Sequence, residues 1–191
     1  MIQVSGRPHA ATSMSTPSTP SSLLADLRLP KAIDSEAAAA LLAALRAGAR
    51  PLWAGGVLLV PTARWTPHLV AAIEAAQREG RLVRGLEQAE KTLAREARGL
   101  SLVDARSAAP RGARVSRLLL VSNDGSPRFY REVERLVAAS SPRLLPIRVD
   151  ADSNQFVSSV PEPSGVVRAL LIEHKELVAA VLLALYRKSD P

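Results

Sequence analysis

The chain has 191 residues, 47% hydrophobic and only 3% aromatic, so we expect one main domain with an aliphatic core. It has no cysteine, which excludes disulfides, thiolate metal sites and cysteine nucleophiles. Its three histidines lie far apart and lack ligand spacing, so we expect no metal and no cofactor. The formal charge of +7 favours an anionic partner such as nucleic acid, with a compositional bias towards arginine and alanine as the alternative explanation.

The N-terminal part differs in composition from the rest. Residues 1–33 are rich in serine, threonine and proline, and we predict a flexible arm, with an organelle presequence as the alternative. Residues 34–65 are predicted to form an N-terminal extension with a helix over 35–47 and an extended segment over 51–60. No apolar run approaches the length of a membrane span, so we expect no membrane partner and an intracellular protein of the cytoplasm, nucleus or nucleolus.

From residue 66 onwards, helical and strand patterns alternate. Thr66 and Ser126 each precede a proline and are predicted to cap helices. We predict a domain over 66–188 with an irregular insertion over 99–114 and a polar loop over 150–164. The predicted strands cover 81–85, 115–121, 144–149 and 166–172, and the predicted helices 66–80, 87–98, 126–140 and 174–188. This alternation predicts a three-layer α/β/α sandwich with a mixed four-stranded sheet.

The segment from Arg81 to Lys91 is the candidate binding site. Gly85 ends a predicted strand, and a helix begins directly after it. The first-turn amides of that helix would favour an anion, and Arg81, Arg84 and Lys91 would supply positive charge around it. Backbone donors and guanidinium groups both suit RNA phosphates. The alternative is an ordinary strand-to-helix turn with a solvated basic strand.

Catalytic interpretations find less support. Asp124 follows a predicted buried strand, but a carboxylate there usually caps the next helix, and no acid–base partner is implied nearby. Gly55 and Gly56 are not followed by a lysine at the spacing of a nucleotide-binding loop. We therefore expect a protein that is not an enzyme and has no small-molecule substrate.

Three stretches resemble a known family when taken in order. The first runs Gly85-Leu86-Glu87-Gln88-Ala89-Glu90-Lys91 and resembles the Gly-x-Asn-Glu-x-x-Lys element of the kink-turn-binding ribosomal proteins, the L-seven-Ae and L-thirty-e superfamily. Residues 118–127 are similar to that family's central strand and Asp-x-Ser-Pro helix start, and residues 169–177 to its last strand and final helix. The resemblance covers about residues 66–188.

The resemblance implies roles for individual residues. Gly85 would allow close approach of RNA, and Lys91 would contact a phosphate. Glu87 stands where the family has asparagine, and Gln88 where it has glutamate. The family also uses an apolar loop to contact an extruded nucleotide. By this resemblance, Phe156 or Val157 would stack on a base. The alternative is that Phe156 anchors this loop to the core.

The family's function implies a role in RNA processing or ribosome biogenesis. We expect a non-catalytic RNA-binding subunit of a ribonucleoprotein, such as a ribosome, a ribonuclease P-type particle or a small nucleolar particle. Its partners would be a kinked or otherwise structured RNA and other protein subunits. The alternative is a protein-interaction module on the same fold that has lost specific RNA recognition. Glu87 favours this alternative, because its carboxylate cannot donate a hydrogen bond and repels phosphate.

Overall fold

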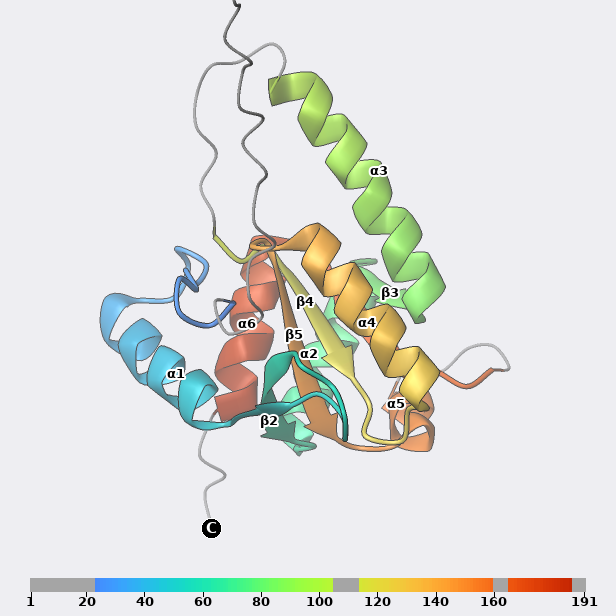
Figure 1. Ribbon diagram of the computed structural model, residues 1–191. Coiled ribbons are helices and arrows are strands. Elements are labelled where there is room, and N and C mark those ends of the chain that lie inside the picture. Colours follow the sequence, from blue (N-terminus) through green and yellow to red (C-terminus); the bar gives the residue numbers. More distant parts are fainter. Residues whose placement is uncertain (1–22, 105–113, 160–164, 187–191) are drawn as a thin grey trace, which may run out of the picture.

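The structure is a computed structural model that describes residues 23–104, 114–159 and 165–186, with the side chains of 102–104 left aside. Within these residues, a mixed six-stranded sheet lies between two layers of helices (Figure 1). The strands are β1 (Ala49–Pro51), β2 (Leu59–Arg64), β3 (Leu82–Arg84), β4 (Arg117–Val121), β5 (Leu144–Asp150) and β6 (Ala169–Ile172). The helices are α1 (Ser35–Ala47), α2 (Pro67–Arg78), α3 (Leu86–Asp104), α4 (Pro127–Ser140), α5 (Ser153–Ser159) and α6 (Lys175–Tyr186).

The sheet has a parallel centre and antiparallel rims. Its strand order is β1-β2-β5-β4-β6-β3, in which β2, β5 and β4 are parallel and the other three strands pair antiparallel. The two outermost strands, β1 and β3, have three residues each. The register places Leu82 opposite Ile172 and Arg84 opposite Leu170, so β3 ends beside the start of β6.

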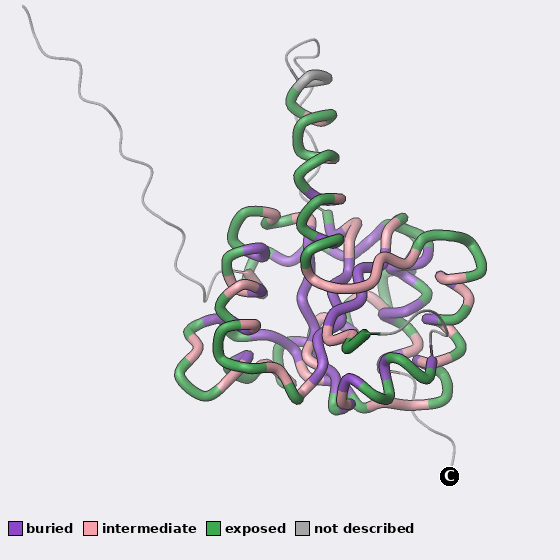
Figure 2. Tube along the Cα trace, turned by 90° about the vertical axis from the view of Figure 1, so that its right-hand side faces the viewer, coloured by how far each residue is buried: buried purple, intermediate pink, exposed green. Residues whose placement is uncertain are grey.

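Alternating side chains divide the core into two apolar layers. On β4, Leu118 and Leu120 face the layer that includes α1, α2, α5 and α6, whereas Leu119 and Val121 face the layer of α3 and α4. All four side chains are fully buried. The strands accordingly form the buried centre of the molecule (Figure 2).

The predicted architecture is confirmed, but the strand number is wrong. The three-layer α/β/α sandwich with a mixed sheet is present, and the domain over 66–188 contributes four strands. The other two, β1 and β2, come from the predicted N-terminal extension, and β2 pairs with β5 near the centre of the sheet. Asp34, Thr66 and Ser126 cap α1, α2 and α4 through their side-chain oxygens. Residues 34–65 are therefore an integral part of the same sheet.

The predicted insertion over 99–114 begins as helix. α3 continues without a break to Asp104, so the loop predicted for 99–104 is wrong, and residues 105–113 lie outside the described part. Gly99 suggested a helix end, but a glycine inside a helix costs only about 1 kcal/mol relative to alanine. Leu93 is buried and Leu100 half-buried on one side of α3, and this packing continues across Gly99.

Two further segments are more ordered than their composition suggested. The predicted flexible arm is wrong for residues 23–33, because Leu24, Leu27, Leu29 and Ile33 are buried in the core; residues 1–22 lie outside the described part. The backbone N–H of Val115 donates to the carbonyl of Arg28 at 2.8 Å, which ties this segment to the chain just before β4. The polar loop predicted over 150–164 contains the short helix α5, and residues 160–164 are not described.

Candidate RNA-binding corner

Gly85 forms an open corner between β3 and α3. It adopts a left-handed conformation with φ of +80°, and its N–H donates to the carbonyl of Ala169 at 2.8 Å. A Cβ atom at this position would meet nothing within 4 Å. In the described part of the chain, the amides of Leu86, Glu87 and Gln88 have no hydrogen-bond acceptor. These three donors and the helix dipole are therefore available to an anion at this corner.

The basic side chains of β3 do not converge on this corner as the sequence suggested. Arg84 directly precedes Gly85 and is half-buried, but Arg81 lies at the other end of the strand, about 13 Å away at the usual rise per residue. Leu82 packs with the α2 and α6 layer and Val83 with the α3 and α4 layer, so Arg81 and Arg84 point to opposite faces of the sheet. The expectation that both arginines surround the start of α3 is wrong.

Glu87 and Lys91 form an ion pair on the first turns of α3. Lys91 Nζ donates to Glu87 Oε1 at 2.7 Å, and both side chains are more than half exposed. The hydrogen bond and the positive charge of Lys91 lower the pKa of the Glu87 carboxyl below its ordinary value. Lys91 therefore lies near the corner, but an RNA phosphate would have to compete with Glu87 for its ammonium group. Gln88 beside them is exposed.

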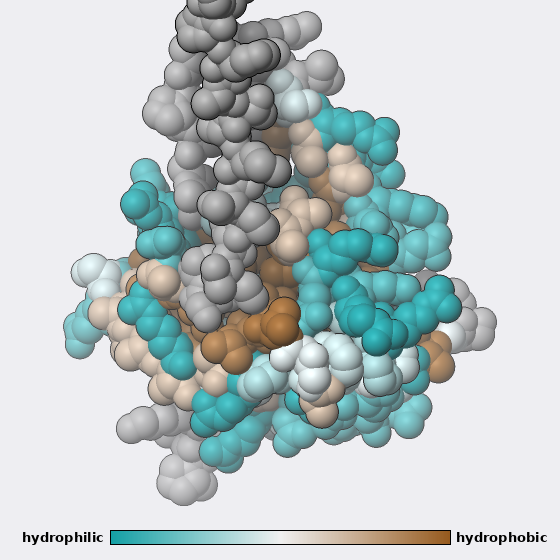
Figure 3. All heavy atoms as spheres, viewed as in Figure 1, coloured by the Kyte–Doolittle hydropathy of each residue, from teal (hydrophilic) through white to brown (hydrophobic). Residues whose placement is uncertain are grey.

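Sequence reasoning missed two rows of exposed basic residues on this face of the molecule. On α3, Lys91, Arg95 and Arg98 recur at the spacing of one helix face, opposite the buried Ala89 and Leu93. On α4, the corresponding residues are Arg128, Arg131 and Arg135. Figure 3 shows hydrophilic colours over α4 and hydrophobic colours over α1. The helical period of the basic residues is the sequence signal that would have found both rows.

The two residues predicted to stack on a base have different environments. Phe156 is fully buried and stacks on Trp65 with ring centroids 5.3 Å apart, so its ring is not available to a nucleotide. Phe156 instead packs in the core, as the alternative interpretation states. Val157 on α5 is 37% exposed and is the accessible apolar side chain of the predicted pair.

Asp124 connects α5 with the start of β6. Its two carboxylate oxygens accept hydrogen bonds from Ser122 and Ser153, both at 2.6 Å, and Arg168 Nε lies 3.6 Å from Oδ1. Burial raises the pKa of Asp124, but the hydrogen bonds from the two serines and the charge of Arg168 outweigh it and hold this pKa below the ordinary value. Asp124 therefore forms a long ion pair with Arg168, whose Nε has no hydrogen-bond partner in the described part of the chain, and Arg168 directly precedes Ala169, to which Gly85 is bonded.

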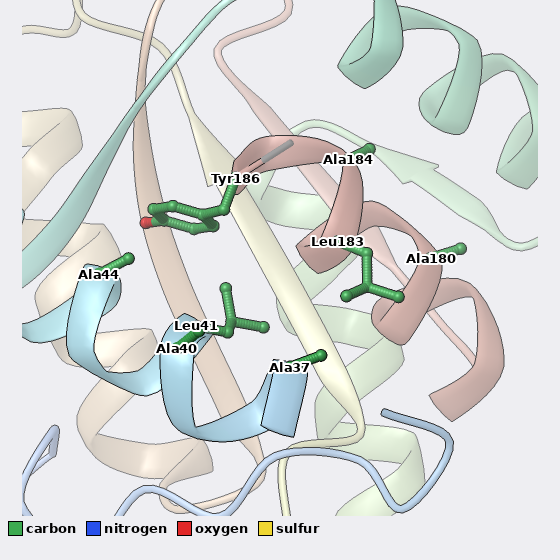
Figure 4. Close-up of a pocket in the computed structure, with 8 residues that line it drawn as sticks. All are labelled: Ala37, Ala40, Leu41, Ala44, Ala180, Leu183, Ala184 and Tyr186. Carbon is green, nitrogen blue, oxygen red and sulfur yellow. The ribbon is translucent and has the colours of Figure 1, made fainter. Parts of the chain in front are cut away.

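An apolar groove lies between α1 and α6, on the opposite side of the sheet. Leu41 of α1 and Leu183 of α6 point into it, and the ring of Tyr186 lies over its end near Ala44 (Figure 4). Leu183 is 43% exposed. Burial raises the pKa of Tyr186 to about 12, and its hydroxyl has no hydrogen-bond partner in the described part of the chain. Alanines from both helices complete the lining: Ala37, Ala40, Ala180 and Ala184.

Among the described residues, no group of three or more histidine, aspartate or glutamate side chains could hold a metal ion. A search of the same residues finds no helix long and apolar enough to cross a membrane.

No family model matches the chain, and no curated protein matches it. One similar solved structure is that of a protein with unknown function from Bacillus halodurans, with 12% sequence identity and a TM-score of 0.40. The match covers 61% of this chain and 98% of the other. We draw neither fold nor function from a likeness at this level.

Proposed function

We propose that this chain is a non-catalytic RNA-binding subunit of a ribonucleoprotein and that it binds a structured RNA at the corner around Gly85. The observation that carries the proposal is the open corner itself. Three consecutive backbone donors at the start of α3 lack acceptors among the described residues, and the glycine before them leaves the space beside the backbone empty. A sugar–phosphate chain can approach such a backbone closely and accept hydrogen bonds from it.

The basic rows on α3 and α4 support the same proposal by electrostatics. Lys91, Arg95 and Arg98 extend from the corner along the outward face of α3. Each cation that neutralises a phosphate releases a condensed counterion, so a row of them contributes affinity without reading sequence. The corner would then orient the RNA, and the rows would hold the phosphates on either side of it.

The resemblance of residues 85–91, 118–127 and 169–177 to kink-turn-binding proteins motivates the choice of a kinked RNA. In this proposal the chain acts inside the cell, in a ribosome, a ribonuclease P-type particle or a small nucleolar particle. Glu87 is the residue that opposes tight recognition, since its carboxylate repels phosphate and holds Lys91. Val157, rather than Phe156, would be the apolar contact of an extruded base.

Filter binding tests the proposal directly. Purified protein would be titrated with a kinked RNA duplex and with a straight duplex of equal length, for the wild type and for Lys91→Ala. We expect tighter binding of the kinked duplex and a several-fold loss in the variant, whereas Lys31→Ala, an exposed lysine remote in sequence from the corner, leaves binding unchanged. Equal and weak affinity for both duplexes, unaffected by Lys91→Ala, would defeat the proposal.

A second candidate function is protein interaction on a fold without specific RNA recognition. The groove between α1 and α6 favours it, because alanines allow close approach of a helix and Leu41 and Leu183 offer apolar anchors. The occupant would be an amphipathic helix of another subunit of the same particle.

Substitution in the groove separates the two candidates. If the groove binds a protein subunit, Leu183→Lys abolishes co-purification of that subunit, and Val57→Lys, at a position 71% exposed, does not. The interaction should survive nuclease and high salt because it buries apolar surface. A different outcome would favour RNA as the link between the two proteins. In that case the complex dissociates on nuclease treatment, and both variants co-purify the subunit as the wild type does.

A further inference from the structure

A second hollow lies at the carboxyl ends of the parallel strands, apart from both the corner and the apolar groove. Its volume is about 390 Å³, within the usual range of small-molecule sites. Its lining comes from β2, β5 and the turn that follows β4: Thr62, Ala63, Arg64, Asn123, Arg148 and Asp150. The carboxyl ends of parallel strands are where open α/β sheets usually bind their ligands.

The strand register explains why polar side chains gather here. Thr62 pairs with Arg148 and Arg64 with Asp150, so the four side chains lie on one face of the sheet. That face is apolar further back along the same strands, where Val60 and Leu144 pack in the layer of α3 and α4. The face therefore changes from apolar to charged at the strand ends.

The helices that follow these strands leave the ends open. After β4 the chain continues into α4, which packs on one face of the sheet through Tyr130 and Val133. After β5 it continues into α5, whose Phe156 packs on the opposite face. Neighbouring parallel strands whose helices leave to opposite faces create a crevice between them.

The charges in the hollow are not balanced. In the part of the chain that the structure describes, Arg64 makes no hydrogen bond or ion pair, and Arg148 donates only to the carbonyl of Leu52, at 3.4 Å. The carboxylate of Asp150 is within 4 Å of neither guanidinium; its Oδ1 accepts instead from Asn123 Nδ2 at 2.9 Å. Two guanidinium groups thus line a hollow whose carboxylate, that of Asp150, pairs with neither of them among the described residues.

We propose that this hollow binds the phosphate group of a small phosphorylated molecule. Guanidinium groups bind phosphate oxygens through paired, charge-assisted hydrogen bonds, and two of them from adjacent strands can hold one phosphate from two sides. Asn123 adds a neutral donor. Asp150 stands at the rim as an acceptor for a hydroxyl group of the ligand, so a sugar phosphate fits the chemistry. The inference does not depend on RNA binding at Gly85.

Calorimetric titration of the full chain with ribose 5-phosphate tests this inference, at constant ionic strength and without RNA. We expect binding by the wild type and about tenfold weaker binding by Arg64→Gln, because one charge-assisted contact is lost. Arg64 makes no hydrogen bond or ion pair with any described residue, so we expect this variant to keep the fold. Arg148→Gln is a second variant, for which we also expect weaker binding. The matched control is Arg78→Gln, which removes the same charge from the end of α2 and leaves binding unchanged.

The result that overturns the inference is absence of heat with the wild type at millimolar ribose 5-phosphate, or equal weakening by Arg64→Gln and Arg78→Gln. A parallel arm uses an RNA duplex without terminal phosphates. If Arg64→Gln weakens RNA binding while ribose 5-phosphate does not bind, the hollow serves the RNA backbone, and the small-molecule assignment is wrong. Binding of ribose 5-phosphate by a protein that binds no RNA would support this inference and count against the proposed function alone.

Discussion

Gly80 and Gly85 share a local conformation but differ in their surroundings along the chain. Both have positive φ values, +65° and +80°, and an added Cβ would meet nothing within 4 Å at either position. Gly80 follows the end of α2, whereas Gly85 precedes the first amides of α3, which have no acceptor among the residues that the structure describes. The pair therefore separates the cost of backbone strain from the effect of a methyl group at the proposed RNA contact.

We predict that Gly85→Ala lowers the free energy of unfolding by about 1 kcal/mol, because an L-residue is disfavoured at positive φ. RNA affinity should fall about tenfold as well, since the methyl group occupies the space that a phosphate would enter. Urea denaturation measures the first effect and filter binding the second. Gly80→Ala should cost similar stability and leave RNA affinity intact; an equal loss of affinity in both variants would show that the corner has no special role.

In the proposed function, the carboxylate of Glu87 limits RNA affinity, so replacing that carboxylate should raise the affinity. We predict that Glu87→Gln increases affinity at pH 7 about threefold to tenfold, because it removes a negative charge near the RNA and releases Lys91. Since the pKa of Glu87 is lowered in the folded protein, the ion pair is fully present above the ordinary carboxyl pKa. It is lost only as the pH falls through that lowered pKa.

Fluorescence anisotropy with labelled RNA provides the measurement for Glu87. Glu36→Gln in the first turn of α1 removes the same charge on the other side of the sheet and serves as the control. If both variants gain affinity equally, the effect belongs to net charge rather than to the release of Lys91. A loss of affinity in Glu87→Gln would instead indicate that the ion pair helps to order the corner.

At the scale of elements, capped and strongly periodic segments were predictable from the sequence. Asp34, Thr66 and Ser126 marked three helix starts because a side-chain oxygen there satisfies an unpaired backbone amide. The end of α3 was not predictable in the same way. The predicted helix ends at residue 98, whereas in the structure the packing of Leu93 and Leu100 outweighs the modest cost of Gly99 within the helix.

The candidate site was predictable only in part. The positive φ of Gly85 and the start of α3 follow from a glycine placed between two periodic segments. The directions of Arg81 and Arg84 could have been read from strand alternation, which places residues three apart on opposite faces. The hollow at Arg64 and Arg148 could not be predicted from the sequence, because it depends on the pairing of β2 with β5, whose residues are far apart in the chain.

The stack of Trp65 and Phe156 links α5 to the segment before α2. We predict that Phe156→Ala lowers the free energy of unfolding by about 3–5 kcal/mol, because a fully buried ring is replaced by a cavity. Guanidinium denaturation followed by tryptophan fluorescence measures the change. This loss is large relative to the total stability of most domains, so a milder variant is needed in case Phe156→Ala does not fold. For Phe156→Leu we expect a smaller loss of the same sign.

Val157→Ala supplies the comparison for this element, because its side chain is 37% exposed. It should change stability by less than about 1 kcal/mol. If Phe156→Ala were as mild as Val157→Ala, the ring would not be a core anchor. If Val157→Ala weakened RNA binding without loss of stability, Val157 would be assigned to the apolar contact.

At the scale of the whole molecule, the two helical layers carry different surfaces. The layer of α3 and α4 presents two rows of cations, and the layer of α1 and α6 presents alanines and an apolar groove. In the functions proposed above, the first layer contacts a polyanion and the second a protein subunit. A sheet buried between the layers keeps the two surfaces apart (Figures 1 and 2).

We predict that RNA binding depends steeply on salt and that the basic row on α3 accounts for part of this dependence. In the double variant Arg95→Gln/Arg98→Gln, the slope of log affinity against log salt concentration should become shallower by about 1.5, because two fewer counterions are released. The measurement is a series of filter-binding titrations at rising potassium chloride. Lys31→Gln/Arg78→Gln removes two charges from segments outside α3 and α4 and should preserve the slope; equal changes in both would assign the effect to net charge.

The two short outer strands have a consequence for the behaviour of the protein in concentrated solution. β1 ends at Pro51, which has no amide hydrogen to offer, and β3 stops after three residues where Gly85 turns the backbone away. In the ranges that the structure describes, the sheet thus presents little free backbone along which a strand of a neighbouring molecule could pair. We therefore expect the aliphatic strands to stay internal to each molecule, because these two edges offer few backbone groups to an incoming strand.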